Sequence, residues 1–259
     1  MTEELLYEIR GEAGWITFNR PAQRNALTFA MYEGVAAICS RVGRTKEVKA
    51  LVITGAGDKA FAAGTDIAQF LDFRDGEDGI AYERKMDSTL DVIERCAVPT
   101  VAAVAGFCTG GGAAIAAVCD FRIAAASAQF GFPIARTLGN CLSLANYARL
   151  AALIGPQRVK EMILLARLFD APAAQQAGLV SEILPNVAAL HARAGELAAT
   201  LAGHAPLTMQ ATKEALRRLQ ARMAEDNIDD LIRLAYGSAD FRDGRTAFLG
   251  KRAPRWTGT

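Results

Sequence analysis

The sequence is poor in the residues on which several common kinds of site depend. It has only two histidines, His191 and His204, in 259 residues, and both lie far from any glycine-rich turn. A Ser-His-Asp or Cys-His catalytic site is therefore not expected. The five cysteines are odd in number, widely spaced and free of any CxxC pair. This pattern argues against a disulfide framework and against a zinc cluster, and we expect no metal site.

Excess charge and a leader signal are also missing. The formal net charge is +1, so no nucleic-acid partner is expected. Residues 1–14 contain no basic segment followed by an apolar one, which predicts a cytoplasmic protein without a membrane partner. Hydrophobic residues make up 51% of the chain, which is enough to bury the core of one large α/β domain or two smaller ones.

An apolar run at residues 99–121, PTVAAVAGFCTGGGAAIAAVCDF, is the central feature of the chain. Glycines 110–112 divide it, which argues against a membrane span and predicts a buried strand over 101–105 and a short helix over 113–118. A glycine turn before a helix exposes main-chain N–H groups that can stabilise an anion. The glycines would equally allow a helix to pack closely on a sheet. The run lacks the GxGxxG pattern of a dinucleotide-binding dehydrogenase.

Strand and helix patterns alternate through the first two thirds of the chain. We predict strands over residues 5–10, 14–19, 49–54, 121–126 and 179–183, with an extended piece at 128–133. Helices are predicted over 28–43, 80–96, 142–154, 156–166 and 171–178, and three more from 187 onward, broken at 203–206 and near 226. Residues 59–67 read as a turn. This order predicts an α/β fold with a largely parallel sheet and a C-terminal helical subdomain.

Four motifs and the tail resemble the enoyl-CoA hydratase/isomerase (crotonase) family. The motifs are QRNAL at 23–27, AFAAGTDI at 60–67, AGFCTGGG at 105–112 and AQQAGLVSEI at 174–183, and the tail is FLGKRAP at 248–254. The resemblance implies a crotonase-like ββα spiral core over residues 1–190 and a helical trimerisation subdomain over 191–259. It also implies a homotrimer or a dimer of trimers. The implied substrate is an acyl-CoA thioester. Coenzyme A is then part of the substrate, and no separate cofactor is expected.

The resemblance also implies site residues. The backbone N–H groups of Thr65 and Gly111 would form an oxyanion hole around the thioester carbonyl, which agrees with the anion site expected at the glycine turn. Positions along the coenzyme A moiety correspond to Arg24, Ala26, Ala63, Asp66 and Ile67, and Lys251 corresponds to a residue that meets a phosphate. Asp66 could instead cap a helix, and Lys251 could be an ordinary surface charge.

Two positions depart from the family pattern. The glutamate that follows the oxyanion glycine by three residues in the hydratases is Ala114 here, and the second glutamate corresponds to Ile134. A positioned acid or base contributes about 10²- to 10⁴-fold to a rate. Ordinary hydratase chemistry through these two positions is therefore excluded, and Ile134 also disfavours a one-glutamate isomerase.

A few residues are candidates to replace the missing carboxylates. Glu83, Asp87 and Asp91 recur at a spacing of four and share one helical face, although such a face is usually solvated. Arg136, Asn140 and Cys141 lie near the second missing glutamate, and a reactive Cys141 would need a lowered pKa. Asp120 is read as a structural end of the central helix. Phe70, Phe132 and Ile134 suit an apolar acyl pocket or a packed core equally well.

Three functions remain open from the sequence. The first is an acyl-CoA lyase or isomerase that stabilises a thioester enolate with a relocated or solvent-supplied base. The second is a thioesterase or decarboxylase, which depends on oxyanion stabilisation more than on paired carboxylates. The third is a non-catalytic acyl-CoA-binding protein, favoured by Ala114 and Ile134.

Overall fold

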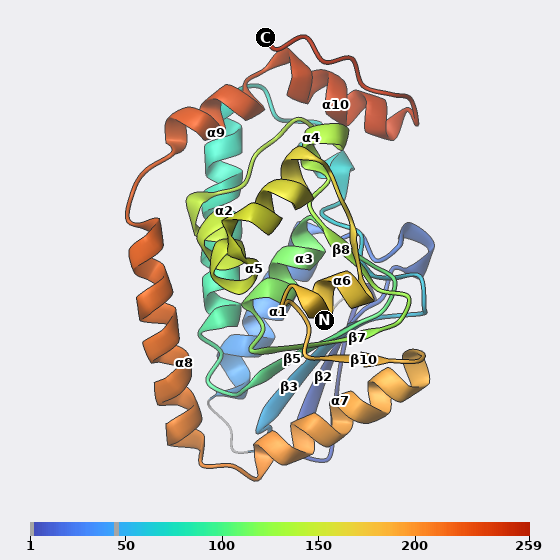
Figure 1. The fold of residues 1–259 in the computed structure, drawn as a ribbon, viewed down its shortest axis with the longest axis vertical. Coiled ribbons are helices and arrows are strands. Elements are labelled where there is room, and N and C mark those ends of the chain that lie inside the picture. The colour runs from blue at the N-terminus through green and yellow to red at the C-terminus, as the bar shows by residue number, and fades with distance from the viewer. Residues whose placement is uncertain (1–2, 44–46) are drawn as a thin grey trace.

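A six-stranded sheet forms the centre of the computed structural model, which describes residues 3–43 and 47–259. The strand order is β1-β2-β3-β5-β7-β10 (Figure 1). β1 and β2 are antiparallel, and the remaining neighbours are parallel. The strands are β1 (Leu5–Arg10), β2 (Ala13–Phe18), β3 (Ala50–Gly55), β5 (Thr100–Val104), β7 (Phe121–Ala125) and β10 (Glu182–Leu184).

A second sheet of four short strands has the order β4-β6-β8-β9. The strands are β4 (Ala60–Ala62), β6 (Phe107–Thr109), β8 (Gln129–Gly131) and β9 (Phe169–Asp170). Along the chain, β4 follows β3, β6 follows β5 and β8 follows β7, and a helix comes after each pair. These successive strand, strand and helix units confirm the predicted ββα spiral.

Three helices share one apolar core with the large sheet: α1 (Phe29–Val42), α2 (Gly76–Glu94) and α3 (Gly111–Val118). Thr28 begins α1 as predicted, because its hydroxyl accepts a hydrogen bond from the Met31 N–H. Asp75 caps α2 with a capping box, so the helix begins at Gly76, four residues before the predicted start. The buried side chains of these helices merge with those of the sheet into one apolar core.

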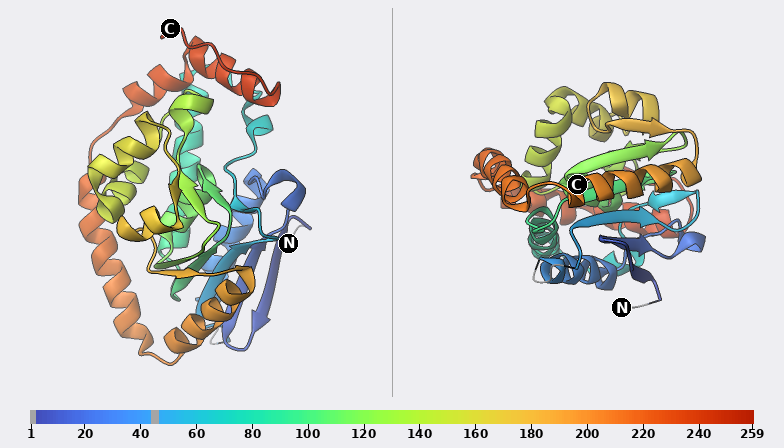
Figure 2. Two further views of the ribbon diagram at one scale, coloured as in Figure 1. Left: turned by 45° about the vertical axis from the view of Figure 1, so that its right-hand side comes forward. Right: turned by 90° about the horizontal axis from the view of Figure 1, so that it is seen from below.

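The opposite face of the sheet is covered by α7 (Val187–Ala202), whose axis crosses several strands (Figure 2). Leu190, Ala194 and Ala198 are fully buried against Trp15 and Val52. Small residues at a spacing of four let the helix approach the sheet closely. Because α7 includes residue 190, the predicted boundary there lies within a helix that packs on the core, and the trimerisation role of residues 191–259 stays a prediction.

The remaining helices surround the open end of the spiral. They are η1 (Pro21–Gln23), η2 (Ile67–Phe70), α4 (Ile134–Thr137), α5 (Leu144–Leu164), α6 (Ala171–Gln176), α8 (Pro206–Ala221), η3 (Arg222–Ala224), α9 (Asp229–Tyr236) and α10 (Ala239–Leu249). α8 runs along the side of the molecule, and α9 and α10 return over the end where α2 begins (Figure 1). Within the described ranges, no helix combines the length and the apolar character needed to cross a bilayer.

Several predicted elements differ from the structure for local reasons. β4 and β6 were expected as turns, because each has only three residues and is too short to show the alternating pattern typical of a strand. The strand predicted at 179–183 begins only at Glu182, because the N–H groups of Leu179 and Val180 still bond to the carbonyl of Ala174 at the end of α6. The C-terminal helices have an additional break, where Ser238 caps α10.

Candidate active site

One cavity of about 770 Å³ gathers all of the positions that the sequence singled out for substrate binding. It lies among the loops after β2, β4 and β6, the helices α2 and α4, and the end of α10. The eight predicted residues that line it are Arg24, Ala26, Ala63, Thr65, Asp66, Ile67, Gly111 and Lys251. Segments from four parts of the chain therefore meet at a single concave site, while the individual roles of these residues stay predictions.

Two main-chain donors open into this cavity. Thr65 pairs with Leu27 in an isolated parallel bridge, in which the flanking bonds run from Leu27 N–H to the Gly64 carbonyl and from Asp66 N–H to the Leu27 carbonyl. Gly111 is the first residue of α3, where an N–H has no partner inside the helix. Among the hydrogen bonds of the described chain, neither the Thr65 nor the Gly111 N–H has a protein acceptor. Both residues line the cavity, and their role as oxyanion donors stays a prediction.

Gly111 is required by the space around it. A Cβ at this position would stand 1.7 Å from the Tyr32 hydroxyl oxygen and 3.0 Å from Thr65 Oγ1. The absence of a side chain at Gly111 thus allows the N-terminus of α3, the Thr65 turn and the hydroxyl of the buried Tyr32 to lie close together. The same contact shows that Tyr32, from α1, belongs to the site.

Asn25 holds the loop that carries Arg24 and Ala26. It is buried, has a φ of 56°, donates from Nδ2 to the carbonyls of Ala56 and Ala60, and accepts from the Arg20 N–H. Asparagine tolerates this left-handed backbone better than most residues, and its amide satisfies three main-chain groups at once. The QRNAL motif is therefore built around the side chain of its central residue.

Replacing Asn25 with alanine is expected to lower the free energy of unfolding by about 2 to 4 kcal/mol, because buried main-chain groups lose their partners and the positive φ becomes strained. Urea denaturation measures the change. Gln23→Ala, at an exposed position of the same loop, serves as the matched control and should stay within about 0.5 kcal/mol of the parent. Equal effects of the two substitutions would contradict this account.

The charged residues near the predicted coenzyme A positions have defined partners. Asp66 caps η2 by accepting from the Ala68 N–H at 3.2 Å, and it pairs with Arg20 at 3.0 Å. The Arg24 guanidinium lies 5.1 Å from the centre of the Phe107 ring. Asp66 therefore has the helix-capping role that the sequence left open, and it also faces the cavity. Arg24 and Lys251 are the basic residues that line the cavity.

Ala114 and Ile134, for which the sequence resemblance implies carboxylates in the hydratases, are both buried side chains that line the cavity. Phe70 and Phe132 line it as well and are also part of the packed core. The wall around these positions is apolar. It suits an acyl chain, and it offers no charge at either of the two positions.

Glu83 is the buried acid of the site. It lines the cavity from α2 with only 4% of its surface exposed. Its Oε1 accepts a hydrogen bond from the Tyr236 hydroxyl, and its Oε2 accepts one from the Ser143 N–H at 2.9 Å. Burial raises the pKa of Glu83 to about 8, although the bond from Tyr236 opposes this shift. The protonated form of the carboxyl therefore predominates at pH 7.

The contact between α2 and α9 holds Tyr236 over Glu83. Gly79 permits it, since a Cβ there would lie 2.3 Å from the Tyr236 ring. Asn140 lines the cavity and donates from Nδ2 to the Tyr236 hydroxyl at 3.1 Å. Its buried Oδ1 has no hydrogen-bond partner among the described residues. Asn140, Tyr236 and Glu83 are thus joined by hydrogen bonds within a cavity wall that is otherwise mostly apolar.

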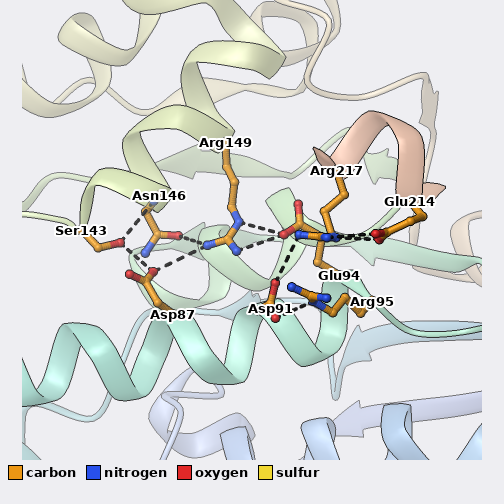
Figure 3. Close-up of polar contacts among 9 residues, drawn as sticks. All are labelled: Asp87, Asp91, Glu94, Arg95, Ser143, Asn146, Arg149, Glu214 and Arg217. Carbon is orange, nitrogen blue, oxygen red and sulfur yellow. Dashed lines mark hydrogen bonds and ion pairs between the residues drawn. The ribbon is translucent and has the colours of Figure 1, made fainter. Parts of the chain in front are cut away.

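The other acids of the predicted α2 face have structural partners (Figure 3). Asp87 accepts from the Ser143 hydroxyl at 2.7 Å, and Asp91 pairs with Arg95 and lies 3.9 Å from Arg217. Together with the ion pair between Glu94 and Arg149, these contacts tie α2 to α5 and α8. Glu83 alone of the predicted triad lines the cavity.

The remaining candidates are not suited to catalysis. Burial raises the pKa of the Cys141 thiol to about 12, which is the opposite of what a nucleophile requires. Arg136 is exposed and lies outside the cavity lining. Asp120 accepts from the Thr100 N–H and hydroxyl and pairs with Lys213, as expected of a structural residue.

The structure combines a spiral of ββα units with a largely apolar cavity and two main-chain N–H groups that have no protein partner among the described residues. The chain matches the model of the enoyl-CoA hydratase/isomerase family over residues 8–259. It belongs to that family and is an acyl-CoA-processing enzyme of the crotonase type.

Individual relatives agree with this assignment. The chain is 33% identical to a probable enoyl-CoA hydratase of Mycobacterium tuberculosis, over 98% of both chains. Its structure is similar to that of an enoyl-CoA hydratase/carnithine racemase from Magnetospirillum magneticum, with a TM-score of 0.80 and 30% identity over 100% of this chain and 97% of the other. It is also similar to a methylmalonyl-CoA decarboxylase in complex with 2-nitronate-propionyl-CoA, with a TM-score of 0.89 and 25% identity over the full length of both chains.

Proposed function

We propose that this protein is an acyl-CoA lyase that stabilises a thioester enolate between the N–H groups of Thr65 and Gly111 and transfers a proton to it from Glu83. The observation that carries the proposal is the pair of unpaired main-chain donors in one cavity. Donors fixed by the fold stabilise developing negative charge without having to reorient during the reaction. Gly111 adds the positive end of the α3 dipole.

The predicted binding residues suit coenzyme A. Arg24 and Lys251 supply positive charge for its phosphates, and the small side chains of Ala26 and Ala63 leave room for the pantetheine arm. The thioester would then lie beside Thr65 and Gly111, with the acyl group in the apolar part near Ala114 and Ile134. Coenzyme A enters as part of the substrate.

Glu83 takes the role of proton donor in this scheme. In hydration, a water oxygen adds to C3 of an enoyl thioester, and the π electrons move onto the thioester oxygen. The proton of Glu83 passes to C2, the added water loses a proton to solvent, and Glu83 regains one. A carboxyl with a pKa near 8 is matched to this step at neutral pH.

Decarboxylation of a malonyl-type thioester is the second candidate, because it requires an acid and no base. The bond from C2 to the carboxylate breaks, CO₂ leaves, and its electron pair is delocalised onto the thioester oxygen. Glu83 then protonates C2. The absence of a carboxylate at Ala114 and Ile134 favours this reaction, as does the similarity to a methylmalonyl-CoA decarboxylase.

A small substrate panel distinguishes these reactions. The purified protein is incubated with crotonyl-CoA, methylmalonyl-CoA and acetyl-CoA. Loss of the conjugated thioester absorbance supports hydration, release of CO₂ supports decarboxylation, and release of free thiol indicates a thioesterase instead. Calorimetric binding without any turnover would make the chain an acyl-CoA-binding protein, and no binding of any thioester would overturn the proposal.

A homotrimer or a dimer of trimers in the cytoplasm completes the proposal. The oligomeric state is what the family resemblance implies, and the cytoplasmic location is the expectation drawn from residues 1–14. Sedimentation velocity of the purified chain tests the oligomeric state.

A further inference from the structure

Three hydroxyl groups form a short chain beside the two main-chain donors. Thr65 Oγ1 lies 2.8 Å from the Tyr32 hydroxyl oxygen and 3.0 Å from that of Tyr82. Among the described residues, these three oxygens have no other hydrogen-bond partner. All three residues line the cavity.

A count of protons shows that this row of three hydroxyls has one O–H that is not used in a hydrogen bond between them. Three hydroxyls carry three protons, and the two hydrogen bonds between them use two. Whatever the direction of the bonds, one O–H remains unused. A buried donor without an acceptor costs about 1 to 3 kcal/mol, which a ligand oxygen could relieve.

Tyr32 is the member of the three that lies next to Gly111. Its hydroxyl oxygen is 1.7 Å from the place of a Cβ on Gly111 and therefore lies beside the second main-chain donor. Tyr82 is at the other end, with its ring packed edge-on against Phe70 at 4.9 Å. If Tyr82 donates to Thr65 and Thr65 donates to Tyr32, the free O–H of Tyr32 is at the end next to Gly111.

Both tyrosines are suited to donate. Burial raises the pKa of the Tyr32 hydroxyl and that of the Tyr82 hydroxyl, so each keeps its proton throughout the neutral range. The Tyr32 ring is buried in the core, and the partly buried Tyr82 ring packs against it, which leaves the hydroxyls little freedom to turn away.

We infer that the Tyr32 hydroxyl is a third hydrogen-bond donor to the enolate oxygen of the thioester, positioned through Thr65 by Tyr82. This rests on the proposed function, because it assumes that the thioester oxygen binds at Thr65 and Gly111. Tyr32 is then a catalytic residue, and Tyr82 is a positioning residue.

Two matched substitutions test the inference. Tyr32→Phe removes the donor at the oxyanion end. Tyr82→Phe removes one hydroxyl from the same chain, but the remaining pair of Tyr32 and Thr65 still has two protons for one bond. We expect Tyr32→Phe to weaken binding of 2-nitronate-propionyl-CoA, a charged enolate mimic, by about 10- to 100-fold, and to lower kcat by a similar factor. Tyr82→Phe should lower both by only about threefold, because Thr65 loses the donor that sets the direction of its hydrogen bond while Tyr32 keeps its proton.

Binding of free coenzyme A separates a catalytic role from a structural one. The affinity for coenzyme A should be unchanged in both variants, because coenzyme A lacks the enolate oxygen. A loss of coenzyme A binding would show that the substitution has distorted the site, and it would overturn the inference. Equal effects of the two substitutions, or full nitronate binding by Tyr32→Phe, would also overturn it. If the parent protein fails to bind the nitronate, the proposed function fails and the inference fails with it; if only the difference between the variants is missing, the proposed function stands.

Discussion

Glu83→Gln is expected to slow turnover of the acyl-CoA substrate by about 10²- to 10⁴-fold, the usual contribution of a positioned proton donor. Glutamine has nearly the same shape and still accepts the hydrogen bond from Tyr236 or Ser143, so the cavity should keep its form. Coenzyme A binding should therefore be retained. Steady-state kinetics with the best substrate of the panel measures the loss.

The pH dependence of kcat/KM in the parent protein is an independent test of Glu83 as the proton donor. Glu83 donates its proton only while it is protonated, and burial raises its pKa to about 8. The value of kcat/KM should therefore fall as the pH rises through about 8, and this descending limb should be absent in Glu83→Gln.

Stability should respond to the same group. The folded state keeps the Glu83 proton up to about pH 8, whereas the unfolded chain releases it near its usual pKa of 4.5. The folded state binds more protons between these two values, so the contribution of Glu83 to stability falls as the pH rises across that window. Glu83→Gln should gain stability relative to the parent over the same range, as measured by urea denaturation at each pH.

Asp91→Asn is the matched control, because it changes an acid on the same helix whose partners are Arg95 and Arg217. Its activity should stay near that of the parent. A fully active Glu83→Gln variant, or one whose pH profile keeps the limb near 8, would remove Glu83 from the mechanism and leave water as the proton source.

The position of Glu83 shows what periodicity can and cannot reveal. Its spacing of four with Asp87 and Asp91 suggested a charged face. In the structure it instead continues the buried stripe of Ile80, Met86, Leu90 and Ile93, at spacings of three and four. An acid within an apolar stripe was therefore visible in the sequence, but its partner Tyr236 comes from a helix far along the chain that no local pattern connects to it.

The other residues of the site also differ in whether a local sequence pattern could predict them. The turns that present Thr65 and Gly111 could be predicted, because glycine patterns act locally and the family resemblance supplied their pairing. Tyr32 could not, since a tyrosine in the buried stripe of α1 reads as core packing. Its place in the cavity lining, its contact with the Cβ position of Gly111 and the distance from its hydroxyl to Thr65 Oγ1 identify it as part of the site. β4 and β6 were missed for the related reason that their pairing partners are distant in sequence.

Restoring the two carboxylates should produce the largest gain of function. In Ala114→Glu combined with Ile134→Glu, both side chains enter the cavity that already presents the Thr65 and Gly111 donors. Each positioned acid or base contributes about 10²- to 10⁴-fold, so hydration of crotonyl-CoA should rise by at least about 100-fold over the parent. Loss of the conjugated thioester absorbance measures it.

The paired variant Ala114→Gln with Ile134→Gln controls for size, because glutamine fills the same volume without acting as an acid or a base. It should show no gain. The two buried carboxyls will also lower stability, since neither has a basic partner in the apolar wall, so melting temperatures must accompany the rates. A folded double-glutamate variant that binds crotonyl-CoA and hydrates it no faster than the glutamine pair would mean that positions 114 and 134 do not flank the double bond. In that case the thioester lies differently in the cavity, and the proposed transfer of a proton from Glu83 to C2 loses its support.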